Sequence, residues 1–142
     1  MAAEYSYIPV QTVAEDENIL FLDGERSCRK GYVSHRNSSG TFRLKGASNG
    51  RAIYQVTFNA NIAVAEGGTV GAISVALQED GETLGNAVAT VTPAAIGDFF
   101  NVALTTFICI PCGCCVTVSV ENVSDGTAID VTNANIVFER VA

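Results

Sequence analysis

The sequence has 142 residues, of which 48% are hydrophobic and 16% charged, and its formal net charge is −7. This length predicts a single domain with a sizeable core, and the composition is too apolar for a disordered chain. The apolar runs are far shorter than the ~20 residues that cross a bilayer, which argues against a membrane span. Eight basic residues against fifteen acidic ones argue against direct binding of nucleic acid, which needs clustered Lys and Arg on a basic surface.

Alternating polar and apolar residues recur about every ten positions between turn signals, whereas helical periodicity is almost absent. In chain order, these patterns predict strands at 41–44, 52–64, 70–78, 84–92, 99–110, 116–120 and 134–141. The pair Asp80-Gly81 is typical of a tight hairpin whose turn needs positive φ. Pro93 ends the strand that follows because it removes a ladder donor. About eight strands without helix predict an all-β jelly-roll β-sandwich.

The predicted strand 99–110 is largely apolar on both of its faces. One face carries Ala103, Phe107 and Cys109, and the other carries Val102, Leu104, Ile108 and Ile110. A strand that is apolar on both sides must be covered on both sides. The opposing sheet of a sandwich covers one face, and the simplest cover for the other face is a second subunit.

Several of these stretches resemble the tumour-necrosis-factor-like jelly roll, the globular head of complement-type proteins and of bacterial spore-surface collagen-like glycoproteins. They are YQVTFNANIAV (54–64), ISVALQEDG (73–81), VALTTFICI (102–110), VTVSVEN (116–122) and NIVFERV (135–141). The resemblance extends from Val33 to the end of the chain. It implies a ten-stranded jelly roll that trimerises about an axis, with apolar and aromatic residues of the central strands between the subunits.

The stretch YSYIPVQTVAEDENILF (5–21), together with CVTVSVEN (115–122), is similar to small proteins encoded in phage and prophage regions of gut Firmicutes. The sequence begins almost directly at the first strand, so we expect no collagen stalk. A free-standing trimeric head fits a virion decoration, fibre-tip or baseplate-associated subunit better than a spore filament. The N-terminus has neither a basic n-region nor an apolar h-region, so we expect assembly in the cytoplasm of the bacterial host.

Four of the five cysteines lie within the stretch CIPCGCC (109–115), namely Cys109, Cys112, Cys114 and Cys115. The spacing of the first two is that of a zinc knuckle, but a tetrahedral site wants a second pair of ligands. Neighbours 114 and 115 point to opposite faces in an extended chain, which makes wrapping one metal difficult. We therefore predict a turn with small buried thiols and no metal. A metal shared around a three-fold axis, disulfides with Cys28 and cross-links between subunits stay open as alternatives.

No other motif in the sequence predicts catalysis or a cofactor. His35 lies in the polar stretch SHRNSSG (34–40), and we expect it to be a solvated loop histidine rather than the partner of a nucleophilic serine. The glycine-rich EGGTVG (66–71) matches neither a phosphate loop nor a dinucleotide fingerprint.

Two acidic clusters and four tyrosines are further candidates for ligand binding. The acidic clusters are Glu15, Asp16 and Glu17, and Glu79, Asp80 and Glu82; the tyrosines are Tyr5, Tyr7, Tyr32 and Tyr54. Complement-type heads sometimes bind calcium near the trimer axis, but neither acidic cluster has the spacing of a calcium loop, which favours solvated turns. The tyrosines offer a weak carbohydrate-stacking signal without tryptophan. Tyr54 is expected to pack internally, and Tyr5 and Tyr7 to dock an N-terminal arm on a neighbour.

The sequence thus predicts an N-terminal arm or first strand at 1–17 and one jelly-roll domain at 18–142. The expected function is that of a non-enzymatic, trimeric structural subunit of a phage particle, without cofactors, whose partners are itself and capsid or tail proteins. The residues predicted at the trimer axis are Phe99, Leu104, Phe107, Ile108 and Ile110. The alternative is a jelly-roll module that binds a carbohydrate or a cell-surface receptor through its loops.

Overall fold

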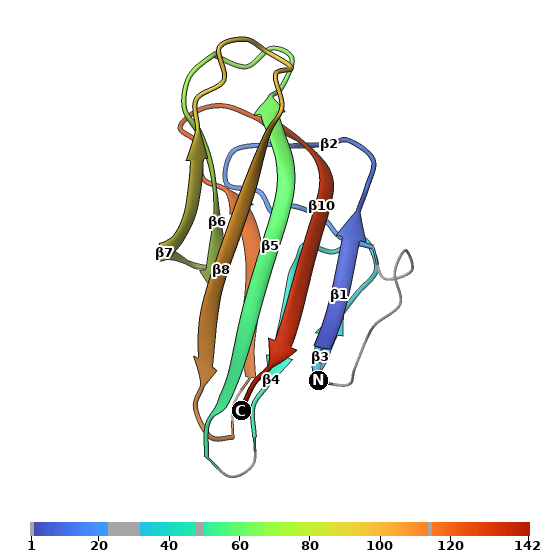
Figure 1. The fold of residues 1–142 in the computed structure, drawn as a ribbon, viewed down its shortest axis with the longest axis vertical. Helices are drawn as coiled ribbons and strands as arrows, with labels where there is room; N and C mark the ends of the chain where they lie inside the picture. Colours follow the sequence, from blue (N-terminus) through green and yellow to red (C-terminus); the bar gives the residue numbers. More distant parts are fainter. Residues whose placement is uncertain (1, 23–31, 48–49, 114) are drawn as a thin grey trace.

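The computed structural model describes residues 2–22, 32–47, 50–113 and 115–142, and these residues form two antiparallel sheets that pack into a sandwich (Figure 1). The first sheet has the order β1 (Ala2–Tyr7), β10 (Ile129–Arg140), β5 (Ala52–Val64), β8 (Phe100–Ile110), and β2 (Gln11–Val13) also pairs with β10. The second has the order β3 (Val33–His35), β4 (Thr41–Lys45), β9 (Cys115–Asn122), β6 (Ile73–Glu79), β7 (Glu82–Val91). This arrangement confirms the predicted all-β sandwich.

The longest strand, β5, shows why this sequence forms a sheet with one buried face. Its inward side chains are apolar and buried, whereas its outward side chains are mostly polar and half-buried. The inward set is Tyr54, Val56, Phe58, Ala60 and Ile62, and the outward set is Ile53, Gln55, Thr57, Asn59 and Asn61. Alternation with period two therefore places one complete set against the opposing sheet.

An aromatic cluster joins the two sheets near β1 and β4. Phe42 of the second sheet lies 4.9 Å from the ring centroid of Tyr5 and 4.8 Å from that of Phe138, which both belong to the first sheet. Phe21 adds a further ring 5.3 Å from Phe42. Such pairs each add about 0.5–1.5 kcal/mol beyond the burial of their area. Tyr5 was expected to dock an N-terminal arm on a neighbouring subunit, but its side chain is buried in the sandwich of its own chain.

The hairpin between β6 and β7 has the expected turn geometry. Asp80 has a φ of 52° and Gly81 a φ of 86°, and Glu79 pairs with Glu82 across the turn. Positive φ at both central residues is the type I′ pattern that matches the twist of the flanking strands. The predicted hairpin is therefore confirmed.

Strand β10 begins five residues earlier than the alternation predicted. The register between β10 and β5 shifts between Thr132 and Asn135, and Asn133 has a φ of 54°. This bulge changes the parity of the strand, so that Ile129 and Val131 face the core before it and Ala134 after it.

Within the described residues there is no helix long and apolar enough to cross a membrane.

Candidate functional site

The outer face of β5 and β8 is an uncharged strip of paired strand surface. The two strands run side by side in the front sheet of Figure 1 and pair in register from Ala52↔Ile110 to Ile62↔Phe100. Their outward side chains, which we call the assembly face, are Ile53, Gln55, Thr57, Asn59, Asn61, Asn101, Ala103, Thr105, Phe107 and Cys109. None of them is charged, in a chain with a net charge of −7.

Phe107 is the most exposed large apolar side chain of this face. It lies opposite Gln55, and the neighbouring row pairs Ile53 with Cys109. The Phe107 side chain is 60% exposed in the single chain. One end of the assembly face is therefore apolar, and a large exposed apolar group on an ordered strand is a typical sign of a contact surface.

The other end of the assembly face carries a ladder of amides that bond to one another. Asn101 Nδ2 donates to Asn61 Oδ1 at 3.2 Å, and Asn61 Nδ2 donates to Asn133 Oδ1 of β10 at 3.2 Å. These side chains already satisfy part of their hydrogen-bonding capacity, so covering them costs less than covering unpaired amides. The ladder was not predicted from the sequence, although Asn59 and Asn61 stand at alternate positions of the predicted strand 52–64.

The structure corrects the predicted set of trimer-axis residues. Leu104, Ile108 and Ile110 are 6%, 1% and 0% exposed, because their positions along β8 point them toward the second sheet. They fill the core of the single chain and leave no surface for a neighbouring subunit. Phe107 points to the opposite side of the strand, since adjacent residues alternate between faces.

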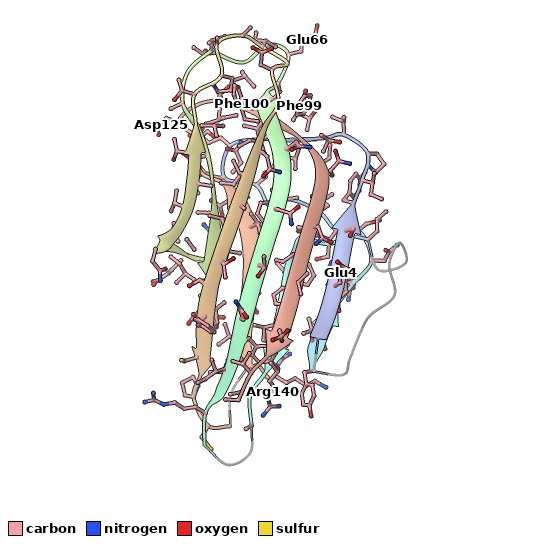
Figure 2. All side chains as sticks on the ribbon, viewed as in Figure 1. Glu4, Glu66, Phe99, Phe100, Asp125 and Arg140 are labelled. Carbon is pink, nitrogen blue, oxygen red and sulfur yellow. The ribbon has the colours of Figure 1, made fainter. Side chains whose placement is uncertain are left out.

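Phe99 is exposed as well, but it does not lie beside Phe107. Figure 2 shows Phe99 and Phe100 at the end of the molecule that also carries Glu66, with Arg140 at the opposite end. Eight residues of strand separate Phe99 from Phe107, or roughly 26 Å at about 3.3 Å per residue. The structure therefore places the two exposed members of the predicted set at different ends of the sheet.

The cysteine-rich stretch connects the two sheets through a turn, as predicted. Cys112 and Gly113 form the turn after β8, Gly113 has a φ of 80°, and its N–H donates to the carbonyl of Ala47 at 3.1 Å. The prediction that the thiols are buried was wrong, because Cys109 and Cys112 are exposed and Cys115 is half-buried. Their strand-end and turn positions leave them outside the core. The predicted metal candidate Cys114, like Cys28, lies outside the described residues.

Other sequence candidates serve local structure. In the described ranges no three His, Cys, Asp or Glu side chains gather as metal ligands. The carboxylate of Asp80 accepts a hydrogen bond from Thr117 N at 2.9 Å, and that of Glu15 accepts one from Gly126 N at 2.8 Å. These two members of the acidic clusters therefore hold turns and strand ends in place.

His35 differs from the predicted solvated loop residue. It belongs to β3, its ring stacks on Phe42 with centroids 4.4 Å apart, and its Nε2 lies 2.8 Å from the carbonyl oxygen of Ser39. The imidazole therefore extends the aromatic cluster to the surface of the second sheet, where it borders an open hollow. A three-residue strand is too short to give an alternation signal, which explains why the sequence pattern indicated a loop.

Two further carboxyl groups near this sheet have raised pKa values. Burial raises the pKa of Glu79, and the neighbouring Asp80 raises it further. Burial likewise raises the pKa of Glu121, with an added effect from Asp16, while a hydrogen bond from Gln78 opposes the rise. Neither residue has a nucleophile or a base placed beside it by the contacts described, so the raised pKa values reflect mainly burial of the two carboxyl groups, with a smaller effect from neighbouring carboxylates.

Comparison with known proteins identifies the fold. No protein-family model matches the sequence, and no curated protein matches it significantly in sequence. Among solved structures, the TNF Eiger from S. frugiperda is similar with a TM-score of 0.67 at 12% identity, covering 99% of this chain and 93% of that one. GITRL from pika is similar with a TM-score of 0.50 at 11% identity, covering 99% and 97%. The chain is a jelly-roll β-sandwich with the TNF-like fold.

Proposed function

We propose that the protein is a non-enzymatic structural subunit that assembles as a homotrimer through its assembly face. The observation that carries the proposal is the ten-residue uncharged strip on β5 and β8, with Phe107 60% exposed at its apolar end. Fifteen carboxylate side chains are distributed over a chain of this size, and none lies on that strip. Like charges from the three copies would repel one another close to a three-fold axis, so a charge-free strip favours assembly about such an axis.

The TNF-like fold supports a symmetric assembly of this kind. A stable contact needs about 800 Å² of buried surface per partner, with an apolar centre and a polar rim. Two paired strands of 13 and 11 residues supply such a strip, with Ile53, Phe107 and Cys109 as the apolar part and the amide ladder as the polar part. The uncharged strip ends on one side at β10, which carries the charged side chains of Asp130 and Glu139.

The virion location is part of the same proposal and rests on the resemblance of 5–21 and 115–122 to phage-encoded proteins. In this role the trimer decorates a capsid or belongs to a fibre, and capsid or tail proteins are its partners. Mass spectrometry of particles purified on a density gradient after prophage induction tests this part. Recovery of the chain at a fixed ratio to a capsid protein supports it, and absence of the chain from otherwise complete particles refutes it.

The assembly is tested by the mass in solution, measured by light scattering with and without reductant and chelator. A mass about three times 14.9 kDa that survives both agents supports apolar burial between subunits. A monomer refutes the homotrimer. Loss of the trimer on addition of reductant or chelator would instead assign the contact to the cysteine-rich turn.

A further inference from the structure

The second sheet carries a hollow surface lined by cations, whereas the assembly face is uncharged. Two hollows of about 520 and 400 Å³ lie over β3, β4 and β9, and both are lined by Ser34 and Arg43. The strand register puts Ser34 opposite Arg43 and Arg43 opposite Thr117, so these three side chains form one row. The next row pairs Lys45 with Cys115. We call the two hollows together the cationic groove.

Cations and hydroxyl groups dominate the lining of the cationic groove. Arg36, Arg43 and Lys45 line it, and among the residues that the structure describes no Asp or Glu does. In the part of the chain that the structure describes, none of these three cations forms an ion pair with a carboxylate. The carboxylate of Asp80 accepts a hydrogen bond from the backbone amide of Thr117, one of the lining residues. Arg43 Nη2 donates to Cys115 Sγ at 3.5 Å. Three cations without a carboxylate partner among the described residues therefore gather in one place on a protein with a net charge of −7.

The hydroxyl groups of Ser34, Ser39, Thr41 and Thr117 surround the cations. A guanidinium presents paired donors that match the oxygens of a carboxylate, sulfate or phosphate group. Hydroxyl side chains both donate and accept, which suits a ligand that itself carries several hydroxyl groups. The ring of His35, stacked on Phe42, supplies a flat edge beside them.

We propose that the cationic groove binds an acidic sugar residue, a carbohydrate unit that carries one carboxylate, sulfate or phosphate group. Arg43 and Lys45 hold the anion, and the hydroxyl side chains bind the sugar ring. Nucleic acid is a poorer match, because binding a phosphate chain needs many cations on a basic surface and this surface has three on an acidic protein. A protein partner would require an apolar contact centre, whereas seven of the eight residues that line the larger hollow are polar or charged.

This site is independent of the proposed trimer contact. The cationic groove lies on the outer face of the second sheet, and the assembly face lies on the outer face of the first. Assembly through β5 and β8 therefore leaves the groove open. A trimer would carry three grooves and bind a repeating polymer with avidity that a single chain lacks.

The test measures binding of the purified protein to immobilised polymers at physiological salt. The probes are polygalacturonate for a carboxylate, dextran sulfate for a sulfate and teichoic acid for a phosphate, with neutral dextran as the control. Saturable binding to at least one acidic polymer, weakened at high salt and absent for dextran, is expected. The polymer that binds identifies the anion. Equal binding to dextran, or no binding to any of the three, overturns the proposal.

Variants then assign the binding to the groove. Arg43→Ala is expected to weaken binding at least tenfold, and Arg43→Lys to weaken it less because it keeps the charge but loses the paired donors. Arg51→Ala is the charge-matched control, since Arg51 is exposed and lines neither hollow. Asp80→Asn is expected to strengthen binding, because Asn tolerates the positive φ of this turn residue and removes a negative charge beside Thr117.

The same variants separate this proposal from the proposed assembly. Light scattering of Arg43→Ala is expected to give the same mass as the unaltered protein. Binding of a short galacturonate oligosaccharide, which reports single sites, is expected to be unchanged by Phe107→Ala. Equal weakening by Arg43→Ala and Arg51→Ala would mean general charge attraction and would overturn the groove as the site.

Discussion

Replacing Phe107 with alanine is the most direct test of the assembly face, and the structure gives its expected size. The side chain is 60% exposed in the single chain. An enclosed phenylalanine buries on the order of 200 Å², so covering the exposed part removes about 120 Å² per subunit from water. At about 25 cal/mol per Å², this burial stabilises the contact by about 3 kcal/mol per subunit, or about 9 kcal/mol for a trimer.

A loss of that size has a large effect on assembly and almost none on folding. About 9 kcal/mol corresponds to a factor of 10⁶ to 10⁷ in the three-chain association constant. Because three chains combine, the concentration of half-assembly rises by about the square root, on the order of a thousandfold. The free energy of unfolding of the monomer is expected to stay within about 0.5 kcal/mol, since exposed substitutions rarely exceed that.

Sedimentation equilibrium between nanomolar and micromolar protein measures the shift, and urea unfolding of the dilute monomer measures stability. Val88→Ala is the matched control, because Val88 is 41% exposed on β7 of the second sheet. It is expected to leave the half-assembly concentration unchanged. Equal effects of the two substitutions, or a trimer of Phe107→Ala that persists at nanomolar concentration, would show that the contact lies elsewhere.

Three further substitutions test the fold and its titration. Ile108→Ala removes a side chain that is 1% exposed, so we expect urea unfolding to show a loss of about 2–5 kcal/mol, with the oligomeric mass retained by the folded fraction. Gly81→Ala places a side chain at a φ of 86° and is expected to cost about 1–2 kcal/mol in the same assay, whereas Gly85→Ala, which meets open space at ordinary φ, is expected to cost much less. Burial raises the pKa of Tyr54, so the folded state keeps a proton that the unfolded chain loses above about pH 10. Stability should therefore fall as the pH rises from about 10 toward the folded pKa, and urea midpoints between pH 8 and 11 should fall less for Tyr54→Phe. An equally steep fall for the variant would assign the alkaline loss to other groups.

The predicted strands show which parts of the fold can be predicted from period-two alternation. The residues of β5 matched the sequence pattern from Ala52 to Val64 because every inward position is apolar and no bulge interrupts it. The start of β10 was missed because the bulge at Asn133 reverses the parity, which makes one strand look like two unrelated patterns. Strands β2 and β3 have three residues each and owe their place to pairing with β10 and β4, which no local pattern records.

The candidate site was only partly predictable for a related reason. Strand β8 was predicted to need cover on both of its faces, but apolar residues on both sides do not tell which side meets the opposing sheet. Phe107 and Ile108 were assigned to one contact although adjacent residues of a strand face opposite ways. The cationic groove was not predicted, since Ser34, Arg43 and Thr117 are brought together only by the pairing of three strands.

The two outer faces of the sandwich differ in their charge. Charge is absent from the paired outward positions of β5 and β8, which favours their placement around a three-fold axis, because charges of the same sign from the three copies would lie close together there. Positive charge is concentrated over β3 and β4, where no acidic residue stands beside Arg43 and Lys45 in the described part of the lining. The carboxylate of Asp80 accepts a hydrogen bond from the backbone amide of Thr117 beside this groove. Since the sandwich core separates the faces, changes to Phe107 and to Arg43 should act independently, one on assembly and the other on anion binding.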